Sequence, residues 1–176
     1  MSEAPRQIPS AFINQARNYL LNDYLPKIER CLEQLTDDQI WWRANESSNS
    51  IGNLLLHLSG NARQWIVSGL GGEADHRHRD REFAQREGIP RAELLSVLKK
   101  TLTEVDEVLG RLDASTLLES KQIQGSNVTA FEAIFHVTEH FSMHTGQIIL
   151  LTKMLASTDF KFYDFSTGVP VRSWLK

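Results

Sequence analysis

Apolar residues recur at the three- and four-residue spacing of amphipathic helices in four long segments of the chain. These segments cover residues 9–35, 50–66, 90–112 and about 129–155. Pro26 should kink or divide the first helix, because proline has no backbone N–H to donate. Asn49 or Ser50 is suited to cap the second helix, which should stop at the glycines of GLGG. The pattern predicts an all-α protein, a four-helix bundle of the up-and-down type.

The connections between these helices differ in character. A long charged segment, about residues 71–89, contains HRHRDREF and separates the second and third helices. It is expected either to cover a functional site or to form a solvated loop held by local ion pairs. The stretch ESKQIQGSNV before the fourth helix predicts a short hairpin or an irregular strand. We expect one domain over residues 1–176, with a core over about 10–156 and a tail over 157–176.

Length and composition fit an ordinary globular protein of 176 residues, with 41% hydrophobic and 23% charged residues. The net charge of −3 gives no electrostatic reason to expect nucleic acid or an anionic membrane as a partner. The N-terminus lacks a signal pattern, and no apolar run reaches the ~18 residues of a membrane span. Cys31 is the only cysteine, so a reducing cytoplasm is expected, with Cys31 as a small buried residue.

Candidate chemistry is concentrated in four histidines. His136, His140 and His144 follow one another at four-residue intervals on the fourth helix, and His57 interrupts the apolar face of the second. The outer two of the three lie about 12 Å apart along the helix axis, too far to share one ion. Two neighbours together with His57 can bind one metal ion between facing helices. The spacing alone leaves open which two neighbours these are.

Polar residues accompany these histidines. Gln147 follows His144 by three residues, and Asn53 and Asn61 lie four residues before and after His57. These positions share helix faces with the candidate ligands. Gln147 and the small residue Gly146 lie around the lower pair, His140 and His144. His76 and His78 in the charged segment are candidates for a fourth ligand, although their cationic context is more typical of exposed residues.

The strings around the histidines resemble a known family. His57 within NSIGNLLLHLSGNARQWI, the following RDREF, and EHFSMHTGQ far downstream are similar to the DinB/YfiT-like superfamily, in an uncharacterised subgroup. The resemblance covers about residues 10–160. It implies a four-helix bundle that holds a divalent metal through His57, His140 and His144. His136, Gln147, Asn61 and Asn53 would then surround the ligands or line the pocket.

The chain also departs from the commoner family string. Met143 and Thr145 occupy positions where that string has a histidine and an arginine. The resemblance therefore does not extend to a role of that arginine in binding an anionic substrate.

Three chemical readings follow. Better-understood relatives are similar to S-transferases that use a low-molecular-weight thiol, which implies a zinc, nickel or iron site, a thiol cofactor and an electrophilic substrate. Metal-dependent hydrolysis is the second reading, but it needs a carboxylate base, and Glu132 and Glu139 are poorly aligned with His140. The third is a non-enzymatic, stress-related metal-binding module, which four protein ligands would favour.

Aromatic residues predict a docking role for the tail. Phe160, Phe162, Phe165 and Trp174 give it more aromatic area than solubility needs. Together with Tyr19, Tyr24 and Leu25 of the first helix, they favour a homodimer. The alternative is that the tail folds back over its own bundle and covers the open end of the metal pocket.

Overall fold

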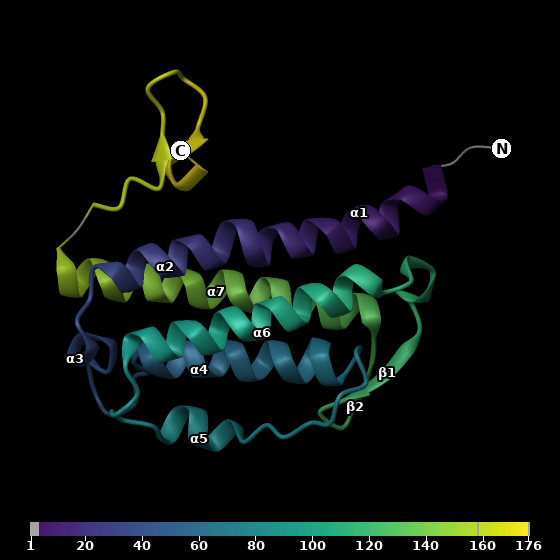
Figure 1. Ribbon diagram of the computed structural model, residues 1–176, viewed down its shortest axis with the longest axis horizontal. Coiled ribbons are helices and arrows are strands. Elements are labelled where there is room, and N and C mark those ends of the chain that lie inside the picture. Colours follow the sequence, from purple (N-terminus) through teal and green to yellow (C-terminus); the bar gives the residue numbers. More distant parts are fainter. Residues whose placement is uncertain (1–3, 158, 176) are drawn as a thin grey trace.

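The computed structural model describes residues 4–157 and 159–175. Its first long helix is interrupted once and forms a helical rod. It consists of α1 (Ala4–Tyr19), a π-helical turn η1 (Leu20–Tyr24) and α2 (Leu25–Glu33). The backbone N–H of Leu25 bonds to the carbonyl of Leu20, five residues back, and Pro26 follows in the first turn of α2. Proline therefore divides this helix as expected, through a π turn that keeps the rod continuous (Figure 1).

The second helix begins at a side-chain cap. Ser50 accepts a hydrogen bond from the backbone of Asn53, and the Asn53 side chain bonds back to Ser50, which forms a capping box at the start of α4 (Ile51–Ala62). A π-helical stretch, η2 (Arg63–Ser68), continues α4 as far as the glycines. A short helix that the pattern did not predict, α3 (Asp37–Ile40), precedes it. Four residues are too few to give a periodic signal.

The remaining elements follow the predicted order. They are α5 (Arg79–Ala84), α6 (Arg91–Arg111), a 3₁₀ turn η3 (Ala114–Thr116), β1 (Ser120–Ile123), β2 (Ser126–Thr129) and α7 (Ala130–Ala156). The antiparallel strands β1 and β2 confirm the predicted hairpin, and both turn residues, Gln124 and Gly125, have positive φ. The charged segment differs from the expected loop because it contains α5.

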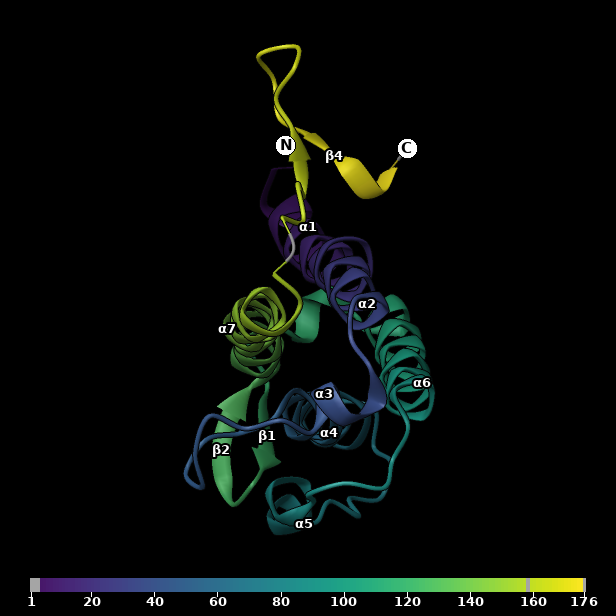
Figure 2. The same ribbon diagram turned by 90° about the vertical axis from the view of Figure 1, so that its left-hand side faces the viewer.

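Viewed end-on, α1–α2, α6, α4 and α7 surround a common core (Figure 2). α4 packs against both α6 and α7, and α2 packs against α7. Side chains that are fully buried include Leu20, Ile28, Leu55, Leu58, Ile66, Leu98 and Phe141. The chain is thus mostly helical, as predicted. Because α5 lies outside this group against α4, residues of the charged segment reach the face of α4 that carries His57.

The tail packs on the first rod. It contains β3 (Tyr163–Asp164), β4 (Val171–Arg172) and a 3₁₀ turn, η4 (Ser173–Leu175). The indole N–H of Trp174 donates to the carbonyl of Asn22 over 3.0 Å, and Phe160 is only 5% exposed. Figure 2 shows the tail beside α1 and α2, away from α4 and α5. A tail covering the metal pocket is therefore wrong, because α7 ends next to α2 and the aromatic side chains pack there.

None of the helices among residues 4–157 and 159–175 combines the length and apolar character needed to cross a bilayer.

Candidate metal centre

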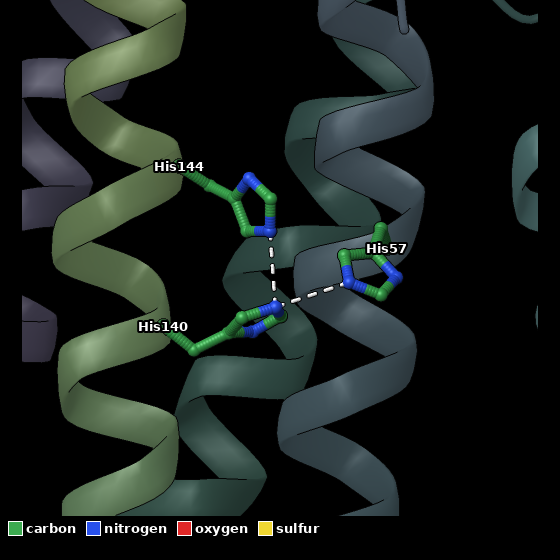
Figure 3. A group of neighbouring side chains, drawn as sticks. All are labelled: His57, His140 and His144. Carbon is green, nitrogen blue, oxygen red and sulfur yellow. Dashed lines mark hydrogen bonds between the residues drawn. The ribbon is translucent and has the colours of Figure 1, made fainter.

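Three buried histidines converge between α4 and α7 (Figure 3). The Nε2 atom of His140 lies 3.1 Å from Nε2 of His57 and 3.0 Å from Nε2 of His144. One nitrogen from each residue lies within 4.8 Å of the other two, and the three side chains are 6–8% exposed. Of the two pairs that the spacing left open, the lower one faces His57. His136 lies one turn before His140 in α7.

The donor set suits a divalent transition metal. Two nitrogens bound to one tetrahedral ion at 2.0–2.1 Å are about 3.3 Å apart. This is close to the distances from Nε2 of His140 to Nε2 of His57 and of His144. Each Nε2 can offer a lone pair only if its ring carries the proton on Nδ1. Nδ1 of His57 lies 2.9 Å from a carboxylate oxygen of Glu82, and Nδ1 of His144 lies 2.7 Å from Oε1 of Gln147. Both oxygens can accept a hydrogen bond from a protonated Nδ1, and in that tautomer both rings direct the Nε2 lone pair inward.

Glu82 comes from α5 and reaches His57 across the surface of α4 at Gly60, which has no side chain. This space, the gap at Gly60, is required because a Cβ atom built there would lie 2.1 Å from Oε1 of Glu82. Arg77 holds the carboxylate from the other side, with Nε 2.7 Å from Oε1 and Nη2 2.9 Å from Oε2. Burial alone raises the pKa of Glu82, but hydrogen bonds from Arg77 and His57 outweigh it, and the pKa is lowered overall. The carboxylate is therefore ionised and orients the imidazole of His57.

Burial also keeps the α7 ligands neutral. It lowers the pKa of His140 to about 3, with further lowering from the neighbouring His144, His57 and His136. The pKa of His144 is lowered by burial, against the hydrogen bond to Gln147, which raises it. A histidine must be unprotonated at the coordinating nitrogen, so both side chains are ready to bind a metal at neutral pH. Nδ1 of His140 is buried without a hydrogen-bond partner among the described residues.

A second layer of polar and aromatic side chains lies above these ligands. The His136 ring stacks on that of His140, with centroids 5.3 Å apart, and its Nε2 lies 3.2 Å from the Asn61 amide nitrogen. The ring of Trp65 lies 4.1 Å from that of His136. Oδ1 of Asn61 and Nε1 of Trp65 are buried without partners in the described part of the chain. His136 and Asn61 thus lie next to the converging histidines.

Asn53 is bonded to the end of α5. Instead of contacting His57, its amide donates to the backbone carbonyls of Glu82 and Gln85 over 2.7 and 2.9 Å. Arg43 also bonds to the carbonyl of Gln85, over 3.1 Å. These contacts fix the end of α5 against the start of α4, and so determine where the Glu82 side chain lies.

Other candidates lie away from the three histidines. His76 and His78 are exposed and are not part of the group found among the described residues. Glu139 is exposed, and Glu132 caps α7 through Thr129. Sequence reasoning missed Arg77, Glu82 and Trp65 as parts of the site. Gly60, one turn after His57, could have indicated their position, because a glycine lets another segment approach a helix closely.

Solved structures with the same arrangement of helices are DinB-like proteins. DinB-like proteins from Bacillus cereus and Bacillus subtilis match with TM-scores of 0.63 each, at 17% and 18% identity. The matches cover 81% and 82% of this chain, and 90% and 94% of the two proteins respectively. A conserved protein from Enterococcus faecalis matches at 15% identity and TM-score 0.65, over 90% of this chain and 99% of its own. The fold of this chain is therefore that of DinB-like helical proteins.

Within this class the family is specific. The chain belongs to the family of proteins of unknown function designated DUF1572, whose model matches residues 7–168. No curated protein matches the sequence. The expected resemblance to DinB-like proteins is confirmed at the level of the fold, and the sequence falls in a family of unknown function, as expected.

Proposed function

We propose that this chain binds one divalent metal ion through His57, His140 and His144, and that it acts as a metal-dependent thiol S-transferase. The observation that carries the first part is the convergence of three Nε2 atoms whose rings are oriented by Glu82 and Gln147. Three protein nitrogens leave at least one coordination position open, as in catalytic rather than structural zinc sites. Nitrogen donors suit zinc, nickel or iron.

The thiol in this proposal comes from outside the chain. Cys31 is fully buried, and burial raises the pKa of its thiol to about 11, so it is neither accessible nor ionised at neutral pH. It also packs near Thr152, two turns of α7 beyond His144. A low-molecular-weight thiol therefore supplies the nucleophile, and its sulfur bonds to an electrophilic carbon as the leaving group departs with its electron pair.

Each part of the site then has a defined task. A divalent ion favours the thiolate form of a bound thiol at neutral pH. Glu82 holds the proton on Nδ1 of His57, and Gln147 does the same for His144. Trp65 Nε1 and Asn61 Oδ1 offer one donor and one acceptor for polar groups of the substrate. The buried position of the histidines limits competition from water.

Two alternatives receive less support. Metal-dependent hydrolysis needs a carboxylate that is free to take a proton, but Glu82 is engaged by Arg77 and His57. A structural, non-enzymatic metal site normally has four protein ligands, whereas the group among the described residues has three. These observations support the S-transferase better than either alternative.

The test combines metal content with activity. Purified protein should contain about one equivalent of metal by elemental analysis, and the double variant His140→Ala/His144→Ala should contain almost none while keeping its circular dichroism. Metal-replete protein should then conjugate low-molecular-weight thiols to electrophiles in a screen, with a hydrolase panel alongside. A loaded protein that only hydrolyses would reject the transferase, and an unchanged metal content in the double variant would reject the ligands.

We also propose a homodimer. Apolar side chains line the outer face of α7, where Phe135, Met143, Leu150 and Met154 are 49–60% exposed. The tail already covers part of the first rod, so the α7 face supports association better than Tyr19, Tyr24 and Leu25 do. Sedimentation equilibrium should give twice the monomer mass at tens of micromolar, and a monomer there would reject the dimer.

The remaining expectations belong to the same proposal. They are an up-and-down order of the four helices, a single domain with its core over residues 10–156 and its tail over 157–176, and a cytoplasmic setting. Limited proteolysis tests the domain boundary, since cleavage should begin after residue 156 and leave the core intact.

A further inference from the structure

A second cavity lies between α4, α6 and the charged segment. Its volume is about 370 Å³, within the range of small-molecule sites. None of the three converging histidines lines it, whereas Arg77 and Glu82 do. These two side chains therefore form the wall between the cavity and the histidine site. A ligand in this cavity would contact Arg77 and Glu82 but none of the three converging histidines.

The cavity exists because the charged segment is attached to the bundle only at certain points. Asn53 holds the end of α5, and the Arg77–Glu82 pair rests against Gly60. Leu56 of α4 and Val97 of α6 contribute apolar side chains to the lining of this cavity. Val97 remains 42% exposed. The result is a mainly apolar floor beneath a polar rim.

Among the described residues, one arginine of the rim has no ion-pair partner. Three arginines (63, 77 and 81) and two carboxylates (75 and 82) line the cavity, so the charges sum to about +1. Asp75 accepts a hydrogen bond from Gln64 over 2.7 Å, and Glu82 is paired with Arg77. Arg63 pairs with Glu104. Arg81 is exposed and has no ion-pair partner among the described residues.

We propose that this cavity binds a small amphipathic monoanion, with its apolar body over Leu56 and Val97 and its carboxylate or sulfonate at Arg81. An apolar floor contributes affinity through buried area, and a free guanidinium at the rim selects a negative head group. A dianion is disfavoured because two carboxylates, Asp75 and Glu82, also line the cavity. No metal ligand lines this site, and Glu82, which contacts His57, is the residue that it shares with the proposed metal site.

Isothermal titration calorimetry with three ligands of equal chain length tests this site. Octanoate should bind the full-length protein with 1:1 stoichiometry, and neutral octanol and cationic octylammonium should bind at least tenfold more weakly. Arg81→Gln should weaken octanoate binding about tenfold, by loss of one charge-assisted contact. Val97→Trp should fill the cavity and abolish binding. Arg111→Gln removes an exposed arginine at the end of α6, outside the cavity, and this variant should bind octanoate like the wild type.

Several results would overturn the proposal. They are the absence of saturable octanoate binding, equal affinity for octanol, unchanged binding by Arg81→Gln, or retained binding by Val97→Trp with native circular dichroism. Competition between octanoate and a fluorinated aryl carboxylate, followed by ¹⁹F NMR, checks the cavity without any substitution and should be complete. The variant His140→Ala/His144→Ala should still bind octanoate, which separates this proposal from the metal site.

Discussion

Replacing Glu82 with glutamine keeps the size of the side chain but removes the charge that Arg77 and His57 share. The side chains of Arg77 and Glu82 are only 5% and 10% exposed, so the guanidinium left behind would be buried without a counter-charge. Removing one partner of a buried pair costs about 3–5 kcal/mol. The amide oxygen of glutamine can still accept one hydrogen bond, so we expect about 3 kcal/mol of lost stability in the metal-free protein.

The same substitution should weaken metal binding. Without the carboxylate, the proton of His57 is no longer held firmly on Nδ1, and loss of such a partner typically costs 10–100-fold in metal affinity. Urea unfolding of the metal-free protein measures the first effect, and zinc titration against a competing chelator measures the second. Glu104→Gln is the control, because Glu104 and its partner Arg63 are 26% and 42% exposed, and such pairs contribute about 0–1 kcal/mol.

A double-mutant cycle separates this cause from general damage to the protein. Arg77→Gln combined with Glu82→Gln leaves no buried unpaired charge, so the double variant should lose less stability than the sum of the single variants. If Glu82→Gln matches Glu104→Gln in stability and binds zinc like the wild type, the role assigned to this carboxylate is wrong.

Further predictions concern the same site and the tail. Gly60→Ala should lower zinc affinity at least tenfold by displacing the Glu82 carboxylate, which competition with a chelator measures. At Gly146 a Cβ meets open space, so Gly146→Ala should leave zinc affinity unchanged and stabilise α7 by about 1 kcal/mol, which urea unfolding measures. In metal-free protein the pKa of His140 is about 3, against 6.5 for an unperturbed histidine, so the unfolded chain binds more protons. Stability should therefore fall as the pH drops from about 6.5 towards 3, and a urea midpoint that stays constant from pH 7 to 4 would contradict this. Phe160→Ala should lower the free energy of unfolding by about 3 kcal/mol, because Phe160 is only 5% exposed. Phe165 is 65% exposed, so Phe165→Ala should lower it by less than about 0.5 kcal/mol. Equal shifts in melting temperature for the two variants would show that the tail does not pack as described.

The long helices and the set of converging histidines could be predicted because both depend on spacing within one helix. Periodic apolar positions located α4, α6 and α7 to within a few residues, and the four-residue interval placed His140 and His144 on one face. The choice between the upper and lower pair could not be derived from spacing. It depends on how far α7 is displaced along α4, which only tertiary packing determines.

The charged segment could not be predicted in the same way. Arg77 and Glu82 resemble solvated residues in sequence, since HRHRDREF has no apolar face to orient it. Their burial follows from two distant features, the gap at Gly60 and the attachment of α5 by Asn53. The tail was predicted to pack on something, but its position beside α2 depends on where α7 ends.

The most direct measurement of the central claim is anomalous diffraction from crystals of the protein grown with zinc, recorded on both sides of the zinc absorption edge. We predict one strong anomalous peak per chain, between α4 and α7, about 2.0–2.1 Å from the Nε2 atoms of His57, His140 and His144. A peak at His76 or His78 instead, or no peak at these three histidines, would contradict the account.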